Sequence, residues 1–296
     1  MRSRQTGTNA AFLTLLAFVF VGCATSRVDA PSIPREWYRE GAGRTVVMLG
    51  GGTFGAAMFA PHAHELSNQF DVIRVQTLNV QTAQSGEPMP PNYTVAAEAN
   101  ALAYTLDAIG IVDPVDVVGS SFGAVVALHF AATHPKRVRT VTLFEPPAFW
   151  VLSDEEYKRD PALREMRELT SAMTSSAAPS DEQFFRFRCL LGSCPPKIPQ
   201  LTDPARKDWD VSRLAMRGLA AVTTHREDPA RLARFPHPVL LLAGSETVAF
   251  HRRINELLAR KMPQIETAVL PGGHSAPRTA STMFVEQLRA FLARHD

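Results

Sequence analysis

The sequence predicts an α/β fold in which a mostly parallel sheet is flanked by helices. Short apolar runs typical of buried strands alternate with segments of helical periodicity along most of the chain. Such alternation favours parallel strands joined by right-handed crossovers. A Gly-x-Ser-x-Gly turn joins one of these strands to the helix after it. One long segment, 148–234, interrupts the alternation and carries helix signals without strand runs.

The composition is that of an ordinary globular protein. The chain has 296 residues, of which 45% are apolar and 20% charged, and its formal net charge is +2. So small a net charge, without a basic run interleaved with aromatic residues, argues against a nucleic-acid partner. We expect neither a cofactor nor a metal ion, and the pattern leaves the oligomeric state open.

The first 22 residues have the pattern of an export signal. A basic start precedes the apolar run Ala11–Val21, which is too short to span a bilayer comfortably. The tetrapeptide at 20–23 resembles the bacterial lipobox, which implies cleavage before Cys23 and acylation of that cysteine. We therefore expect a signal peptide at 1–22, a tether at 23–35, and a lipid anchor in the cell envelope. By resemblance to Gram-negative lipoproteins, Ala24 favours the outer membrane.

Five strands and three helices are expected before the interruption. The strands are Glu36–Arg39, Thr45–Leu49, Asp71–Gln76, Val115–Val118 and Val138–Phe144. The first helix follows a glycine-rich loop and reaches about Leu66. The second begins at Thr94, carries apolar residues at helical spacing and stops at Gly110. The third follows Ser121 and must end before Pro135, because the residue before a proline disfavours helical geometry.

The segment 148–234 is expected to form three or four helices inserted between two core strands. Its helix-start signals are two capping boxes, at Ser153 and Ser180, and two Asp-Pro pairs, at Asp203 and Asp228. The chain therefore divides into a first core part at 36–147, the helical insertion, and a second core part at 235–296.

Two strands and two helices are expected in the second core part. They are the strand Pro238–Ala243, the helix Phe250–Lys261, the strand Thr267–Leu270 and a closing helix with Phe284, Leu288, Phe291 and Leu292 on one face. In the middle helix, Ile254, Leu257 and Leu258 are expected to point inward.

Ser121 occupies the joint between the strand that ends at Gly119 and the Ala-rich helix that begins at Phe122. Gly119 and Gly123 lie two residues to either side of the serine, where a Cβ atom would clash inside a sharp turn. The turn exposes the serine hydroxyl at a helix N-terminus, whose partial positive charge favours a developing anion. This arrangement is typical of a nucleophile.

The turn resembles the nucleophile elbow of the α/β-hydrolases, and the resemblance covers Gly41–Pro147 and Pro236–Ala293. It implies an α/β-hydrolase fold in which the insertion between two core strands is a lid. A serine hydroxyl needs a base that takes its proton. His274, in the loop Pro271–Ser275 just after the last expected strand, matches the family's catalytic histidine in chain order.

The acid of the expected Ser-His-acid triad has two candidates. Most members of the family place it at the position that Thr247 occupies here, which carries no charge, and Glu246 lies one residue earlier. Some members place the acid at the end of the strand after the elbow helix, where this chain has Glu145. We favour Glu145, because a carboxylate after an apolar strand needs a partner. The following Pro146 should also hold Glu145 in extended geometry. Glu246 remains the alternative.

The resemblance also implies an oxyanion hole built from two backbone N–H groups. One belongs to Phe122, and the other comes from Gly52 or Thr53 in the loop after the first core strand. The same loop, 50–55, matches the G-x-G-x-x-G spacing of a dinucleotide-binding oxidoreductase. That fingerprint requires an acid at the end of the next strand, whereas Asp71 starts it. We therefore prefer the hydrolase.

The cysteine count agrees with export. If Cys23 carries lipid, Cys189 and Cys194 remain as a pair around the short loop Leu190–Ser193. An envelope compartment permits their disulfide, which would contribute about 2 kcal/mol at most to stability. The C-x4-C spacing without a nearby histidine is a poor match to a zinc site.

These patterns predict a serine hydrolase of the carboxylesterase or lipase type, which cleaves a small-molecule ester through an acyl-enzyme. A serine nucleophile argues against epoxide hydrolases and dehalogenases, which resemble this fold but use aspartate. Phe54, Met58, Phe149 and Trp150 suggest an apolar acyl site. The alternative from another class is a non-catalytic envelope lipoprotein that retains the hydrolase fold for binding.

Overall fold

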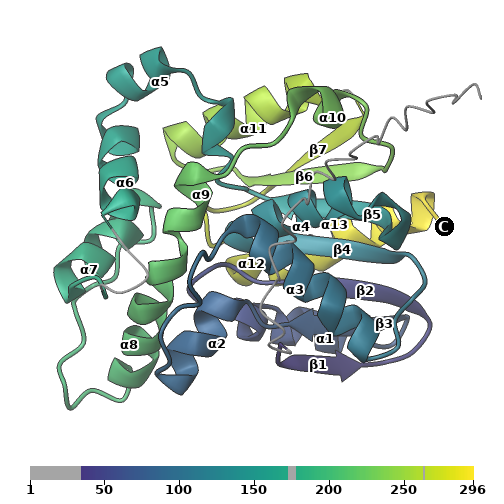
Figure 1. The fold of residues 1–296 in the computed structure, drawn as a ribbon, viewed down its shortest axis with the longest axis horizontal. Coiled ribbons are helices and arrows are strands. Elements are labelled where there is room, and N and C mark those ends of the chain that lie inside the picture. The colour runs from purple at the N-terminus through teal and green to yellow at the C-terminus, as the bar shows by residue number, and fades with distance from the viewer. Residues whose placement is uncertain (1–34, 173–177, 263) are drawn as a thin grey trace, which may run out of the picture.

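A single sheet of seven strands lies at the centre of the described residues, which are 35–172, 178–262 and 264–296 of the computed structural model. The expected signal peptide and Cys23 lie outside them. The strands are β1 (Trp37–Glu40), β2 (Arg44–Leu49), β3 (Phe70–Val75), β4 (Val115–Ser120), β5 (Val138–Phe144), β6 (Val239–Gly244) and β7 (Ile265–Leu270). Their order is β1-β3-β2-β4-β5-β6-β7, and only β1 pairs antiparallel (Figure 1). The predicted mostly parallel sheet is confirmed.

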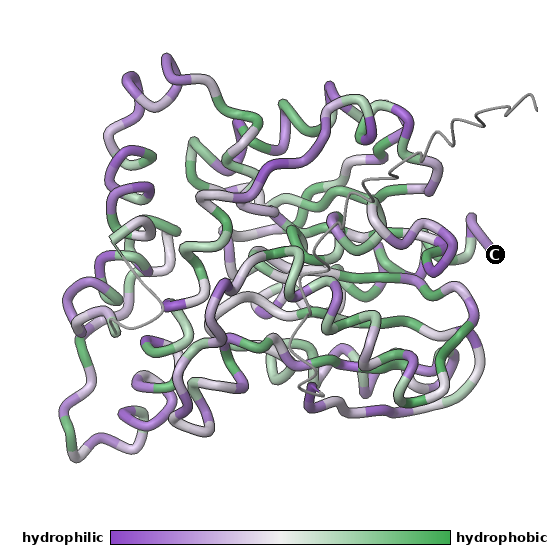
Figure 2. Tube along the Cα trace, viewed as in Figure 1, coloured by the Kyte–Doolittle hydropathy of each residue, from purple (hydrophilic) through white to green (hydrophobic). Residues whose placement is uncertain are grey.

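Helices cover both faces of this sheet. They are α1 (Ala60–Leu66), α3 (Val95–Ala108), α4 (Phe122–Thr133), α11 (Ala249–Lys261) and α13 (Ser281–Arg294). Because successive strand side chains point to opposite faces, Val47 and Leu49 of β2 join the core under α3, α4 and α11. Val46 and Met48 join the opposite core, under α1 and α13. Figure 2 shows the central strands as largely hydrophobic, with hydrophilic positions recurring along the surrounding helices.

The helix α2 (Leu78–Ser85) follows β3 and was not expected from the sequence. It lacks a continuous apolar stripe, so its periodicity gives little signal. Val80 and Ala83 instead pack against Ala215 at the end of α8 (Arg206–Ala215). A tertiary contact therefore stabilises this helix.

The lid lies between β5 and β6, and its described residues form helices joined by turns and loops, without a strand. Its elements are η3 (Phe149–Val151), α5 (Asp154–Arg159), α6 (Pro161–Ser171), α7 (Asp181–Leu190), α8 (Arg206–Ala215), η4 (Met216–Gly218), α9 (Ala220–Thr224) and α10 (Pro229–Ala233). The segment thus holds more helices than the three or four expected. Within the described part of the chain, no helix is both long enough and apolar enough to cross a membrane.

Three of the four predicted helix starts in the lid are confirmed. Ser153 and Ser180 both form complete capping boxes, and Asp228 caps α10 with proline at its first position. A further cap, Asp160 before α6, accepts hydrogen bonds from two backbone N–H groups of the first turn. It was overlooked because it follows the short helix α5 directly.

The fourth start, at Asp203-Pro204, is wrong. Helix α8 begins at Arg206, and residues 201–205 form turns. The Asp203 carboxylate accepts a hydrogen bond from the Gln200 N–H (2.8 Å) instead of capping a helix. An Asp-Pro pair suits a turn as well as a helix start, and here the local hydrogen bond favours the turn.

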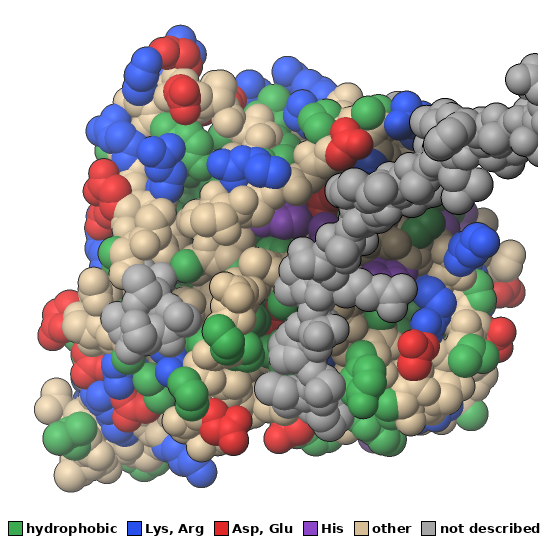
Figure 3. Space-filling model, in the orientation of Figure 1, with side chains coloured by type: hydrophobic (Ala, Val, Ile, Leu, Met, Phe, Trp, Pro, Cys, Tyr) green, Lys and Arg blue, Asp and Glu red, His purple; other side chains and the backbone are tan. Residues whose placement is uncertain are grey.

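Charged side chains join the lid helices to one another. Asp181 at the start of α7 accepts hydrogen bonds from Arg206 of α8 (2.8 Å) and from the indole Nε1 of Trp209 (2.8 Å). Figure 3 shows further Lys and Arg side chains gathered over α5 and α6 on the outer surface. The lid therefore has a charged exterior, while its inner residues extend the core over the carboxyl ends of the strands.

Candidate active site

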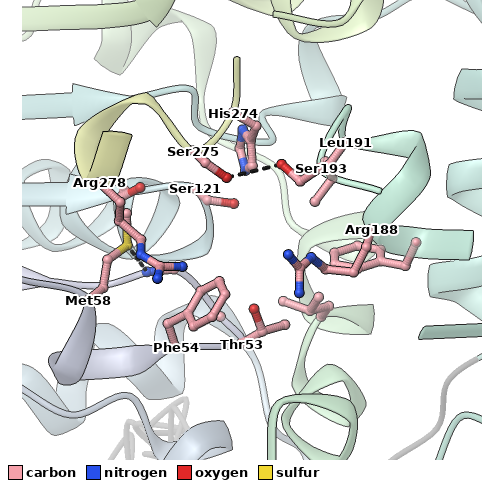
Figure 4. Close-up of a pocket in the computed structure, with 15 residues that line it drawn as sticks. Thr53, Phe54, Met58, Ser121, Arg188, Leu191, Ser193, His274, Ser275 and Arg278 are labelled. Carbon is pink, nitrogen blue, oxygen red and sulfur yellow. Dashed lines mark hydrogen bonds between the residues drawn. The ribbon is translucent and has the colours of Figure 1, made fainter. Parts of the chain in front are cut away.

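Ser121 stands on a strained turn between β4 and α4. Its φ is 52° and its ψ −119°, and its N–H donates to the Phe144 carbonyl (2.8 Å). A Cβ atom at Gly119 would lie 2.4 Å from the Gly123 carbonyl oxygen, and one at Gly123 would lie 2.3 Å from that of Leu49. Only glycine fits at either position, as the sequence predicts. The backbone thereby presents the Ser121 side chain toward the pocket (Figure 4).

His274 lies in the loop after β7 and faces the same pocket as Ser121. Its Nδ1 donates a hydrogen bond to Oε2 of Glu145 (2.6 Å). The other oxygen, Oε1, accepts from the backbone N–H of Gly244 (2.8 Å). In the part of the chain that the structure describes, the Ser121 hydroxyl forms no hydrogen bond with His274. Such contacts are often long in unliganded sites and shorten when substrate binds.

Burial and hydrogen bonding shift the pKa of the Glu145 carboxyl group in opposite directions. The side chain is completely buried, which by itself raises the pKa of its carboxyl group. The hydrogen bond from His274, the nearby His251 ring and the Gly244 N–H outweigh burial and lower that pKa to about 2. Glu145 is therefore a carboxylate at neutral pH.

The backbone of Glu145 differs from the extended geometry that the following proline was expected to impose. Its φ is 40°, in the region that non-glycine residues rarely adopt. Its N–H donates to the Leu242 carbonyl (3.2 Å), while its carboxylate bonds to Gly244 and His274. These tertiary hydrogen bonds hold the residue in a strained conformation despite the preference of a residue before proline.

The other candidate acid lies away from the histidine. Glu246 is exposed, and in the described residues its carboxylate has no contact with His274. Thr247, at the usual acid position of the family, is buried with its hydroxyl unbonded among the described groups. Of the two carboxylates left open by the sequence, the structure brings only Glu145 to His274.

A second histidine, His251, packs on this pair and was not identified from the sequence. Its ring stacks on that of His274, with centroids 4.6 Å apart and planes at 17°. Only 1% of the residue is exposed, and its Nδ1 has no partner among the described groups. Burial, together with the neighbouring His274, lowers the pKa of His251 to about 3 although Glu145 opposes this. The one available signal was its position near the start of the helix after β6.

Among the described residues, two groups of side chains have the composition of a metal site. One is Glu145 with His251 and His274, and the other is Glu227 with His129 and His225. In the second, one Glu227 oxygen lies 2.6 Å from Nδ1 of His129 and 2.9 Å from Nε2 of His225. These are hydrogen-bond distances, so the carboxylate already satisfies both rings. This cluster joins α4 of the core to the lid.

The expected oxyanion donors lie beside Ser121. Phe122 is the first residue of α4, so its N–H has no acceptor within the helix. Gly52 lies against Phe122, since a Cβ atom on Gly52 would come within 3.0 Å of Phe122 Cβ. Asn79 of α2 donates to the Gly52 carbonyl (2.7 Å) and to that of Ala215 (2.8 Å). Asn79, which the sequence did not single out, thus fixes this loop.

Thr53, the alternative second donor, is also buried and lines the pocket beside Gly52.

The structure does not support the interpretation of this loop as a dinucleotide-binding site, because the acid that such a site requires is not at the end of the next strand. Asp71 lies at the start of β3 and pairs with Arg39 (2.7 Å). At the other end of β3, the Gln76 Oε1 accepts from Ala56, and a Cβ atom at Gly55 would lie 1.8 Å from it. Packing therefore explains Gly55.

Two hollows meet at Ser121. One, here called the mouth of the pocket, spans about 560 Å³ including space open to solvent, with polar side chains from Thr53, Arg188, Ser193, Ser275 and Arg278 in its wall (Figure 4). The other spans about 360 Å³, also including space open to solvent, and is mostly apolar, with Phe122, Phe149, Met166, Leu191 and Phe250. Of the residues expected to form an apolar site, Phe149 lines the second hollow, while Phe54 and Met58 line the first. The expectation for Trp150 is wrong, because this residue lines neither hollow and packs edge-on against His225.

The predicted disulfide between Cys189 and Cys194 is present. It closes a loop whose Leu191 and Ser193 both line the mouth of the pocket. The Ser193 hydroxyl also bonds to that of Ser275 (3.0 Å), directly after His274. The disulfide-closed loop of the lid therefore contacts the core loop that carries His274.

Similarity to known proteins agrees with this geometry. Residues 44–278 match the family described as alpha/beta hydrolase fold. The pimeloyl-[acyl-carrier protein] methyl ester esterase of Neisseria meningitidis serogroup B / serotype 15 (strain H44/76) is 25% identical over 214 residues, covering 70% of this chain and 75% of the relative.

Two solved structures show the same fold. A hydrolase from Pseudomonas aeruginosa PA01 is 22% identical with a TM-score of 0.64, over 86% of this chain and 93% of that one. A thermophilic esterase from Thermogutta terrifontis is 19% identical with a TM-score of 0.66, over 88% and 94%.

Replacing His251 should change how stability depends on pH. An unfolded chain protonates this ring below its ordinary pKa of 6.5, whereas the folded protein keeps it neutral to about pH 3, beside Glu145 and His274. The unfolded state therefore gains the proton first, and stability falls as pH drops through this window, by up to about 1.4 kcal/mol per pH unit. His251→Gln should remove that component from urea unfolding curves between pH 7 and pH 4.

The exposed His64 provides a control, because His64→Gln removes a histidine that is 87% exposed at its side chain. This variant should keep the wild-type pH slope. Equal slopes for wild type and His251→Gln would contradict the expectation.

Proposed function

The chain belongs to the alpha/beta hydrolase fold family, and we propose that it is a serine hydrolase that cleaves a carboxylic ester. The observation that carries the proposal is that Ser121 and His274 line one pocket, while the buried Glu145 carboxylate bonds to His274 from behind it. The methyl ester esterase among the relatives supports an ester as the substrate class.

In the proposed mechanism, the Ser121 hydroxyl attacks the acyl carbonyl while Nε2 of His274 takes its proton. The Nδ1–H of His274 remains bonded to Glu145, which selects the tautomer and stabilises the imidazolium. His274 then gives the proton to the departing alcohol. In the second half, His274 takes a proton from water, the water attacks the acyl-enzyme, and Ser121 regains its proton.

The negative charge of each tetrahedral intermediate would develop beside Phe122. Its free N–H at the start of α4 is one proposed donor, and the N–H of Gly52 or Thr53 is the second. Asn79 holds the carbonyl of Gly52, so the peptide groups of this loop are oriented before substrate arrives. Preorganised donors of this kind stabilise the transition state without further rearrangement.

Backbone strain argues for catalysis over the alternative of a non-catalytic binding lipoprotein. Ser121 and Glu145 both have positive φ, at a cost on the order of 1–3 kcal/mol each. Strain at the residue that would attack and at the residue that would orient the base favours an enzyme. A binding protein has no need for either conformation.

Ser121→Ala and His274→Ala should each remove nearly all turnover of an activated ester, with losses of about 10⁶ in kcat as in other triads. A fluorophosphonate should label wild-type Ser121 and fail to label Ser121→Ala, as mass spectrometry of the tryptic peptide would show. Circular dichroism confirms that both variants fold. Wild-type rates in either folded variant would refute the assignment.

The acid is tested by a matched pair of substitutions. Glu145→Gln removes the charge that faces His274 and should lower kcat by about 10⁴, because an amide can stabilise the wrong tautomer of the imidazole. Glu246→Gln changes an exposed side chain and should lower kcat by less than about tenfold on the same scale. Both are measured with one activated ester. If the Glu246→Gln variant loses activity while the Glu145→Gln variant keeps it, the acid is Glu246, just after the end of β6.

We also propose that the enzyme is anchored by lipid on Cys23 in the cell envelope, on the outer membrane or on the periplasmic face. The support is the sequence pattern of the apolar run and the lipobox-like tetrapeptide. Cys23→Ser should leave an unprocessed precursor, because cleavage of a lipoprotein signal depends on acylation of this cysteine. Intact-mass analysis of both proteins from the envelope fraction checks this. An unmodified but normally cleaved wild-type chain would contradict it.

A further inference from the structure

Two arginines point into the mouth of the pocket from opposite sides. Arg188 lies in the last turn of α7 in the lid, and Arg278 lies in α12 (Ala276–Thr279), four residues after His274. Figure 4 shows their guanidinium groups on either side of the Phe54 ring. The guanidinium carbons lie 5.8 Å and 4.8 Å from the centroid of that ring. The same wall contains Ser121 and Gly52.

Neither arginine has a counter-ion among the described residues. No hydrogen bond or ion pair of their side chains is formed there, and the mouth of the pocket is lined by no aspartate or glutamate from the described part of the chain. Burial lowers the pKa of Arg188, and the charge of Arg278 lowers it further. Two neighbouring lid arginines differ, since Arg186 pairs with Glu165 and Arg206 pairs with two aspartates.

Two like charges that face each other without a counter-ion repel, and their repulsion is relieved when an anion binds between them. Guanidinium groups present several N–H donors in a plane and suit carboxylate oxygens. The Phe54 ring contacts both groups through cation–π interactions, and their N–H groups form no hydrogen bond with the described residues. The hydroxyls of Ser193 and Ser275 add polar atoms to the same wall.

We propose that Arg188 and Arg278 bind a carboxylate group of the substrate at the mouth of the pocket. The inference rests on the proposed hydrolase function and adds its substrate class: an ester with an apolar part and an anionic part. The apolar part enters the second hollow, between Phe149, Met166 and Phe250. The reacting carbonyl lies at Ser121, where the two hollows meet.

The backbone at Arg188 is constrained by a neighbouring disulfide. It directly precedes Cys189, whose disulfide with Cys194 closes the loop beside the pocket, and the Arg188 carbonyl accepts a hydrogen bond from the Ser193 N–H (2.9 Å). Arg278 is fixed by the short helix α12, in which its N–H bonds to the Ser275 carbonyl (2.9 Å). Preorganised charges bind an anion with little loss of conformational entropy.

The test compares matched esters. 4-Nitrophenyl hexanoate is the neutral reference, mono-4-nitrophenyl adipate carries a carboxylate at the end of an equally long acyl chain, and 3-carboxy-4-nitrophenyl hexanoate carries it on the leaving group. The two anionic esters separate an acyl-side anion from a leaving-group anion. Wild type should prefer at least one of them by kcat/KM. In Arg188→Gln and Arg278→Gln that preference should fall about tenfold or more, because each loses a charge-assisted contact.

Arg186→Gln is the control variant, because Arg186 lies on the same helix but is paired with Glu165 on the surface. It should keep the wild-type preference. Added salt should weaken the preference of wild type and leave the Arg188→Gln/Arg278→Gln double variant unchanged. A wild type that prefers the neutral ester to both anionic esters would overturn the proposal, as would a preference that survives in the double variant.

A measurement without turnover separates this proposal from the hydrolase assignment. The adipate dianion should raise the unfolding temperature of wild type and Ser121→Ala, and it should not raise that of the double arginine variant. If no ester is hydrolysed but adipate still stabilises in this pattern, the hydrolase assignment fails and the anion site stands. The opposite result would be that wild type hydrolyses neutral esters, prefers neither anionic ester and is not stabilised by adipate. That result would support the hydrolase assignment and overturn the anion site.

Discussion

The buried carboxylate of Glu145 determines how the ends of three strands meet. Glu145 follows β5, one of its oxygens bonds to Gly244 at the end of β6, and the other bonds to His274 after β7. A buried charge without such partners would be very costly, so the three strand ends must converge for the fold to tolerate it. The orientation of His274 and the positive φ of Glu145 both follow from this convergence.

The features predicted from the sequence are those with local causes. The turn at Ser121 needs glycines on both sides, and the capping boxes at Ser153 and Ser180 are complete within four residues. The sequence named two carboxylates for His274 and favoured Glu145, but it left Glu246 open, because the choice depends on how the strand ends approach one another. The outward position of Glu246 appears only in the folded structure.

The features that sequence analysis missed are defined by contacts between distant segments. Asn79 has no local role in α2, yet it joins the loop at Gly52 to the end of α8. The pKa of His251 is lowered to about 3 only by burial and by the neighbouring His274, so the ring stays neutral in mild acid. In the same way, Arg188 resembles any lid arginine in the sequence, and the folded chain distinguishes it from Arg186 by the absence of a partner among the described residues.

The backbone conformation of Ser121 lowers stability, whereas its hydroxyl is the group proposed to react. Its φ of 52° lies where glycine alone is unstrained, so Gly at this position would fit the backbone better than serine does. Such a change would relieve on the order of 1 kcal/mol of strain and remove the hydroxyl at the same time. Because Ser121 is the proposed nucleophile, engineering for thermal resistance would drive this site toward inactivity, a local case of the trade-off between stability and activity. Variants selected on unfolding temperature alone need a separate screen for Ser121.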